Sequence, residues 1–174
     1  LWGRQSYRLS DLDLEANARD RIAVDWPVRS ADLAPWYDYV ERFAGISGSR
    51  EGLSHLPDGQ FLPPMEMNCL ERQVKDRIAK SFGGRPMIIG RVANLTQPHN
   101  GRGGCQFRNR CIRGCPYGAY FSSNAATLPA SYATGKLTLR PFSIVTELIY
   151  AAKTRRVTGV RIVDAETNQT SEYY

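Results

Sequence analysis

This sequence of 174 residues lacks long apolar runs and a recognisable signal peptide, and it contains little lysine. No run of about 18 apolar residues occurs, so we expect no transmembrane segment. The opening residues show no signal-peptide pattern, but we expect the sequence to be a piece of a longer chain whose targeting segment lies outside it, so the compartment, cytoplasmic or periplasmic, stays open. Lysine is also scarce, with four lysines against nineteen arginines and a net charge of +6. Because the arginines are scattered and form no basic run, we expect no nucleic-acid partner.

Cysteine is rare and unevenly distributed. Of four cysteines, Cys105, Cys111 and Cys115 fall within the stretch GRGGCQFRNRCIRGCPYGA at positions 101–119. Disulfides would require pairs, with Cys69 as the remaining partner. Zinc would require four ligands, often in paired C-x2-C knuckles, whereas the spacing here is C-x5-C-x3-C-P. Iron–sulfur clusters are held by thiolates on loops in which a Cys-Pro pair recurs. The spacing therefore leaves three interpretations: a cluster, a zinc site or unligated thiols.

Glycines and arginines surround these cysteines. The glycines let the backbone wrap closely and direct N–H groups toward sulfur. The arginines would offset the negative charge of a buried anion. The four arginines that interleave with the cysteines are Arg102, Arg108, Arg110 and Arg113. This cluster favours a local anionic group rather than a nucleic acid.

The rest of the chain predicts helices first and strands last. Apolar and aromatic residues at helical spacing predict a helix with an aromatic inner face over residues 30–45 and a second amphipathic helix over residues 68–81. A β-branched run predicts a strand over residues 85–93. Successive strand patterns predict an antiparallel meander over residues 137–174. We expect an α+β fold, with a helix- and loop-rich part over residues 1–136 followed by the meander. The expected buried positions of the meander are Leu139, Ile144 or Val145, Leu148, Val160 and Ile162.

The stretch from Arg91 to Ala119 resembles a segment of the glucose–methanol–choline (GMC) oxidoreductases. The similar branch contains the flavin subunits of gluconate, fructose and FAD-dependent glucose dehydrogenases. These subunits have a closely similar C-x5-C-x3-C-P-x-G-A element, which in several members holds a three-iron, four-sulfur (3Fe-4S) cluster. The resemblance continues through residues 119–126 and 138–148, and includes the opening stretch LWGRQSYRLSD. It implies a fragment of a two-domain fold that binds FAD and substrate.

The resemblance implies that the complete protein is an FAD-dependent oxidoreductase. Such an enzyme oxidises an alcohol or sugar hydroxyl by hydride transfer to flavin. The residues that the resemblance places near FAD are Trp2, Gly3, Arg4, Asn124 and Val145, and those that it places on a 3Fe-4S cluster are Cys105, Cys111 and Cys115. Electrons would leave through the cluster to a cytochrome or a small subunit. Residues 1–136 would belong to the substrate cap and cysteine loop, and residues 137–174 to the FAD-binding domain.

Two elements of the family pattern are missing from the sequence. The dinucleotide fingerprint G-x-G-x-x-G is absent, and the Gly101–Gly104 stretch has the wrong spacing to replace it. The family's catalytic histidine, which lies near the C-terminus, is also absent. We therefore expect a central segment of a longer enzyme, inactive alone, with its catalytic residues outside this chain. The alternative is a zinc-stabilised binding module that uses Cys69 together with the three clustered cysteines.

Overall fold

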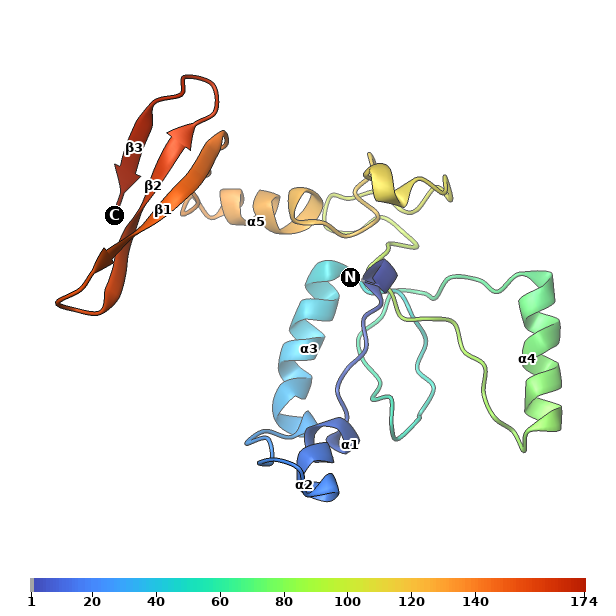
Figure 1. The fold of residues 1–174 in the computed structure, drawn as a ribbon. Helices are drawn as coiled ribbons and strands as arrows, with labels where there is room; N and C mark the ends of the chain where they lie inside the picture. The colour runs from blue at the N-terminus through green and yellow to red at the C-terminus, as the bar shows by residue number, and fades with distance from the viewer. Residues whose placement is uncertain (1) are drawn as a thin grey trace. The chain divides into compact units, whose positions relative to one another are not determined.

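A computed structural model describes residues 2–174; the side chain of Trp2 lies outside the described part. The chain divides into two units, one ending at Ala130 and one running from Ser131 to Tyr174. Helices and loops make up the first unit and an antiparallel sheet most of the second, which confirms the α+β class (Figure 1). The elements are η1 (Trp2–Arg4), α1 (Asp11–Leu14), α2 (Ala16–Asp20), α3 (Ser30–Ala44), α4 (Cys69–Ser81), η2 (Cys111–Arg113), η3 (Ser123–Thr127), α5 (Leu128–Ala133), β1 (Ser143–Ala151), β2 (Arg156–Asp164) and β3 (Thr170–Tyr173).

Helix α3 forms where the sequence predicts a helix, but it buries a different face. The Asp32 carboxylate accepts a hydrogen bond from the Arg29 backbone N–H at 2.9 Å and fixes the first turn. Glu41 and Ala44 are its buried residues, whereas Trp36 is 71% exposed. The predicted aromatic inner face is therefore only partly formed, since Tyr37 and Phe43 are half-buried. The buried position of Glu41 follows from its partner, an arginine at the N-terminal end of the chain.

That partner is Arg8, and the two form a buried ion pair. Arg8 Nε lies 2.9 Å from Glu41 Oε1, and its Nη2 lies 2.6 Å from Oε2. Both side chains are 7% exposed. The backbone N–H of Gln60 donates to Glu41 Oε2 at 2.7 Å, and Asp38 also accepts from Arg8. The charge of Glu41 is thus compensated by several donors, as a buried carboxylate requires.

A small apolar cluster lies between α3 and the extended segments that follow it. Ala44, Ile46 and Ala93 are buried, and Phe61 and Phe121 pack against them. These residues come from segments far apart in the sequence, joined by single bridges rather than by a continuous ladder. The strand predicted over residues 85–93 is therefore wrong, since only an isolated bridge at residue 92 forms there.

Gly45 ends α3 and provides a test of this packing. Its φ is +73°, in the left-handed region, and a Cβ there would lie 2.9 Å from His99 Cδ2 and closer still to Leu95 Cδ2. We expect Gly45→Ala to lower the free energy of unfolding by about 2–5 kcal/mol, because backbone strain and overpacking add. Gly83→Ala is the matched control: its φ is +61° with open space around it, so about 1–2 kcal/mol is expected. Urea unfolding measures both values, and equal losses would contradict the close packing at Gly45.

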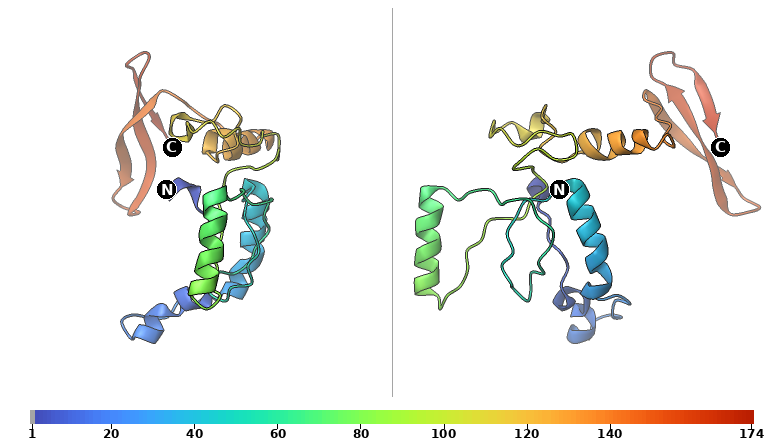
Figure 2. Two further views of the ribbon diagram at one scale, coloured as in Figure 1. Left: turned by 90° about the vertical axis from the view of Figure 1, so that its right-hand side faces the viewer. Right: turned by 180° about the vertical axis from the view of Figure 1, so that it is seen from behind.

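Helix α4 confirms the second predicted helix. Asn68 is its N-cap. The Asn68 side chain accepts a hydrogen bond from the Glu71 backbone N–H at 2.9 Å, and the Glu71 carboxylate accepts one from the Asn68 backbone N–H at 2.8 Å. Two extended segments join the helix to the rest of its unit (Figures 1 and 2). Cys69 lies in the first turn of this helix, of which no residue is buried, and it is exposed.

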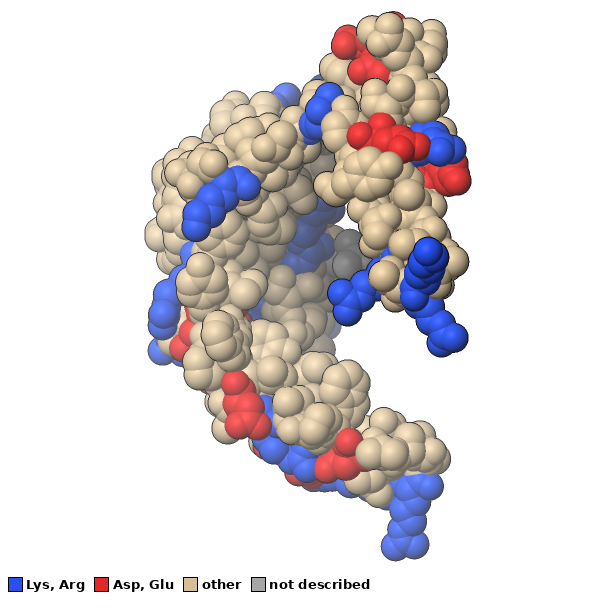
Figure 3. Space-filling view, turned by 90° about the vertical axis from the view of Figure 1, so that its left-hand side faces the viewer, with Lys and Arg blue, Asp and Glu red and all other residues tan. Residues whose placement is uncertain are grey.

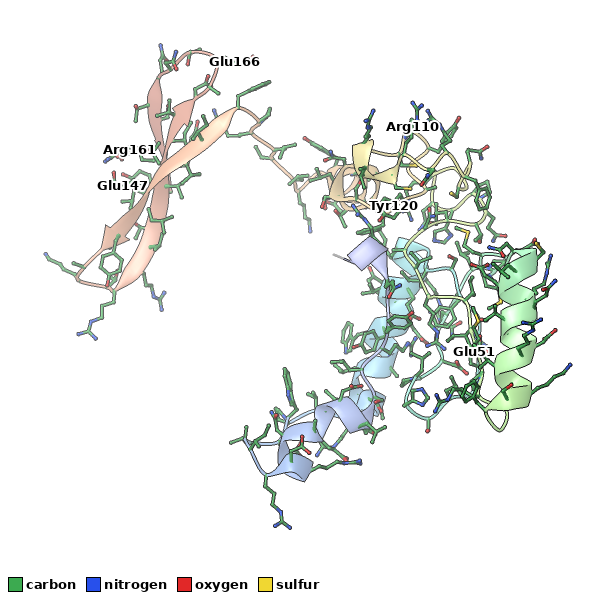
Figure 4. The ribbon with its side chains drawn as sticks, turned by 45° about the vertical axis from the view of Figure 1, so that its right-hand side comes forward. Glu51, Arg110, Tyr120, Glu147, Arg161 and Glu166 are labelled. Atoms are coloured by element: carbon green, nitrogen blue, oxygen red, sulfur yellow. The ribbon has the colours of Figure 1, made fainter. Side chains whose placement is uncertain are left out.

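The sheet of the second unit has the order β1-β2-β3, with antiparallel neighbours. Cross-strand partners share a face, so the pairings Glu147 with Arg161 and Arg161 with Glu172 place these three side chains together. Arg161 forms ion pairs with both glutamates, at 2.8 Å to Glu172. Glu147 and Arg161 lie beside each other in Figure 4. One face of the sheet thus carries a line of charges across all three strands.

The structure confirms an antiparallel meander of three strands, and the predicted burial only on its central strand. Residues 137–142 form no strand. Ile162, on the central strand, is 4% exposed, and Val160 is half-buried. The positions that are exposed although we expected burial are Leu139, Ile144, Val145 and Leu148. Within residues 131–174 the sheet is a single layer, so β2 is flanked by a strand on each edge, whereas β1 and β3 each have one neighbour and are more exposed.

Within the described part of the chain, no helix is both long and apolar enough to cross a membrane. On the face drawn in Figure 3, Lys and Arg side chains lie singly or in small groups among acidic and neutral ones. This distribution agrees with the scattered arginines of the sequence.

Candidate functional site

The segment that carries the three cysteines is anchored at its N-terminal end by backbone hydrogen bonds. His99 and Arg102 bond to each other through N–H and C=O at 3.0 Å in both directions, around a turn whose Asn100 and Gly101 have φ values of +47° and +74°. Two positive φ angles are typical of the tight turns of hairpins, and glycine adopts them without strain. Further along, the Cys105 N–H donates to Leu95 O at 2.8 Å. The loop therefore begins from a fixed base.

Cys105, Cys111 and Cys115 line one small cavity of about 30 Å³. Arg108, Arg110 and Tyr120 also line it. Figure 4 labels Arg110, on the cysteine loop, and Tyr120, on the segment that follows it. The cysteines carry free thiols. Residues 2–174 contain no group of three or more His, Cys, Asp or Glu side chains arranged as metal ligands. The three cysteines thus line one cavity, but their sulfur atoms do not lie close enough together to form a metal site.

Backbone N–H groups surround two of these sulfurs. The Phe107 N–H donates to Cys105 Sγ at 3.4 Å. Burial by itself would raise the pKa of the Cys115 thiol, but backbone N–H groups of residues 117–120 outweigh burial, Tyr120 most strongly, and lower this pKa. Such donors stabilise a thiolate, which is the form that binds metals.

Alkylation of the metal-free protein tests this arrangement. Because the pKa of Cys115 is lowered, its reaction with iodoacetamide should reach half its maximal rate at a lower pH than the roughly 8.5 of an unperturbed thiol. Mass spectrometry of peptides after timed alkylation measures the rate at each pH. In Cys115→Ser the peptide that contains residue 115 has no thiol at that position and gives the background of the measurement. A midpoint at or above the unperturbed value would contradict stabilisation by the N–H groups.

The arginines do not all face the cysteines. Arg108 and Arg110 line the cavity, as the interleaved pattern suggested, whereas Arg102 does not. Arg102 is 7% exposed, and its Nη2 donates to Ala44 O at 2.7 Å, at the C-terminal end of α3. Sequence reasoning missed this role, because a turn that reverses the chain after residue 99 cannot be deduced from the spacing of arginines.

The residues expected near FAD fall in three places. In the first unit, Arg4 Nε donates to Phe121 O at 2.8 Å, and its guanidinium lies 4.1 Å from the centre of the Tyr120 ring. This contact joins the N-terminal segment to the residues that follow the cysteine loop. Gly3 has a φ of +60°, and the side chain of Trp2 lies outside the described part.

Asn124 and Val145, the other two residues expected near FAD, are exposed. Asn124 lies in η3, in the same unit as Arg4, whereas Val145 lies on β1 of the second unit. Sequence reasoning missed Tyr120, which lines the cysteine cavity and stacks on Arg4. Its only signal was its place in the stretch that follows the cysteine loop.

Comparison with known proteins gives two relatives, and no family model matches the chain. The chain is 27% identical over 172 residues to 6'''-hydroxyparomomycin C oxidase of Streptomyces lividus, covering 97% of this chain and 31% of that protein. It is 28% identical over 143 residues to paromamine 6'-oxidase of Streptomyces fradiae, covering 80% of this chain and 25% of that protein. Both relatives are named oxidases. The chain therefore spans a third or less of the length of the relatives that it matches.

Proposed function

We propose that this chain is the central part of an oxidoreductase that oxidises a hydroxyl group of a small molecule. The observation that carries the proposal is the similarity to a named oxidase over 97% of the chain. A second named oxidase matches 80% of the chain. A match of that extent covers the cysteine loop and the sheet together. It therefore relates this chain to an oxidase segment rather than to one isolated motif.

We further propose that the complete enzyme is a GMC-type flavoprotein, with FAD as the hydride acceptor. When bound, flavin supplies the two-electron chemistry that amino-acid side chains lack. Gly3, Arg4, Asn124 and Val145 are the described residues proposed to line its site. Arg4 suits this role because its contacts with Phe121 O and the Tyr120 ring hold its cationic group in place. The base that removes the hydroxyl proton is expected outside this chain.

The cysteine loop is proposed to hold a 3Fe-4S cluster, with Cys105, Cys111 and Cys115 as ligands. Three observations support this ligand set: three free thiols line one cavity, backbone N–H groups lower the pKa of the Cys115 thiol, and two arginines line the same cavity. A space of 30 Å³ accommodates about one water molecule, so the loop must open to admit a cluster. When bound, a cluster supplies one-electron transfer to a separate partner, proposed to be a cytochrome or a small subunit.

The relatives also suggest the substrate class. Their names refer to paromamine and to a hydroxyparomomycin. We propose that the substrate of this protein is an alcohol or sugar hydroxyl, with amino sugars as the first candidates. Neutral sugars and simple alcohols belong in the same screen.

Flavin reduction in the full-length protein tests the proposed function. Under anaerobic conditions the visible absorbance of bound flavin should bleach when paromamine or another hydroxylated sugar is added. A matched compound that lacks the oxidised hydroxyl should leave the absorbance unchanged. A full-length protein that contains no flavin, or whose flavin is reduced by none of the sugars and alcohols, would overturn the proposal.

A further inference from the structure

The first unit has a second cavity, which shares no lining residue with the cavity of the cysteine loop. Its volume is about 360 Å³, within the range of small-molecule sites. Its walls are mostly apolar, from Phe43, Ala126, Pro129 and Ala130, and two polar side chains, Asn100 and Arg102, also line it. All of these residues precede the boundary between the two units.

Arg102 is the charged group of this cavity, and its charge is only partly compensated. The side chain is more than nine-tenths buried. Its Nη2 donates to Ala44 O at 2.7 Å and lies 3.4 Å from Phe43 O. Its buried Nη1, by contrast, has no hydrogen-bond partner among the residues that the structure describes. A buried donor without an acceptor is costly, and such groups are rare in folded proteins.

No carboxylate of the described chain offsets the charge of Arg102. Burial alone lowers the pKa of its guanidinium, whereas Arg8 and Arg91, the other buried arginines, each pair with a carboxylate. The difference matters, because a buried cation without a counter-ion attracts an anion more strongly than a paired one does. The carbonyl groups at the end of α3 supply only partial negative charge.

We propose that this cavity binds a small organic carboxylate whose apolar body lies against Phe43 and Pro129. Arg102 would receive the carboxylate, since a guanidinium matches its two oxygens, and the Asn100 amide would stand beside it. The apolar walls favour a carboxylate with a hydrocarbon or aromatic body over inorganic phosphate, which has no apolar part to bury. The cavity is lined by none of the residues proposed to hold FAD or the cluster, and the proposal does not depend on the oxidation chemistry.

Fluorine NMR of the full-length protein with 4-fluorobenzoate tests the site, and 4-fluorobenzamide is the neutral probe of the same shape. We expect saturable binding of the carboxylate, and binding of the amide at least about tenfold weaker, since a hydrogen bond to a charged group contributes at least that much. Inorganic phosphate should compete poorly. Equal affinity for the two probes, displacement by phosphate at equal concentration, or no binding of 4-fluorobenzoate would each overturn the proposal.

Two variants separate the binding role of Arg102 from its role at the end of α3. Arg102→Gln should weaken 4-fluorobenzoate binding at least about tenfold. Ala130→Phe should block the cavity from its exposed wall while leaving the bonds of Arg102 intact. Arg21→Gln removes an exposed arginine outside the cavity and should leave binding unchanged. If Arg102→Gln fails to fold, Ala130→Phe still tests the site. Loss of 4-fluorobenzoate binding in that variant supports the proposal, whereas unchanged binding would show that the probe binds outside this cavity.

Discussion

Replacing Glu41 with alanine should lower the free energy of unfolding by about 3–5 kcal/mol, one of the two largest effects that we expect in this chain. The variant leaves Arg8 buried at 7% exposure without its main partner, and it removes the acceptor of the Gln60 N–H. In the native protein the pKa of Arg8 is raised, chiefly by its hydrogen bond to Glu41. Without that partner the guanidinium still keeps its proton, because arginine is charged at any ordinary pH, so the variant cannot avoid the cost by deprotonation. Urea unfolding monitored by circular dichroism measures the loss.

The matched control is an ion pair on the surface of the same unit. Glu15 and Arg19 pair at 2.7 Å on α2 and its N-cap, with 31% and 52% of their side chains exposed. Glu15→Ala should cost less than about 1 kcal/mol, because water replaces the lost partner. If the two variants lose equal stability, the Arg8–Glu41 pair does not hold the helix to the N-terminal segment as described.

The second large effect concerns the cysteines. Cys111→Ser and Cys115→Ser should each abolish stoichiometric iron and acid-labile sulfide in the anaerobically purified full-length protein, because a three-iron cluster needs three thiolates. Cys69→Ser is the matched control: this cysteine is exposed on α4 and does not line the cavity. Its replacement should leave the iron and sulfide content unchanged.

Other metal contents would decide against the cluster. One zinc per chain without sulfide, lost in Cys69→Ser as well as in Cys111→Ser, would favour a zinc-stabilised module. Wild-type protein without either metal would leave the three thiols unligated. Either result contradicts the proposed ligand set while leaving hydroxyl oxidation by flavin open to its own test.

The predictable parts of this fold are those whose signals are local. The apolar residues spaced along three turns were enough to place α4. The capping box that the structure shows at Asn68 is a local signal of the same kind, because it depends only on nearby residues. The β-branched residues of β1 and β2 likewise predict strands, because they favour extended backbone wherever they pair. Gly45 marks the end of α3 through its own conformational freedom.

Burial and tertiary contact were harder to predict. The buried face of α3 is set by Arg8, more than thirty positions away, so helical periodicity favoured Trp36 and missed Glu41. Residues 85–93 have the composition of a strand but no neighbouring strand, and only one residue forms a bridge. In the candidate site, the spacing of the cysteines predicted that they share one region, whereas the orientation of Arg102 depends on the turn at Asn100.

Electron paramagnetic resonance of the anaerobically purified full-length protein, recorded before and after addition of an oxidisable sugar, tests whether electrons pass from the substrate through flavin to a cluster on the cysteine loop. We expect the signal of an oxidised three-iron cluster before addition, and loss of that signal together with flavin bleaching once the sugar has been oxidised. A protein that shows no cluster signal and no flavin change with any hydroxylated substrate, and that contains one zinc per chain, would contradict this expectation.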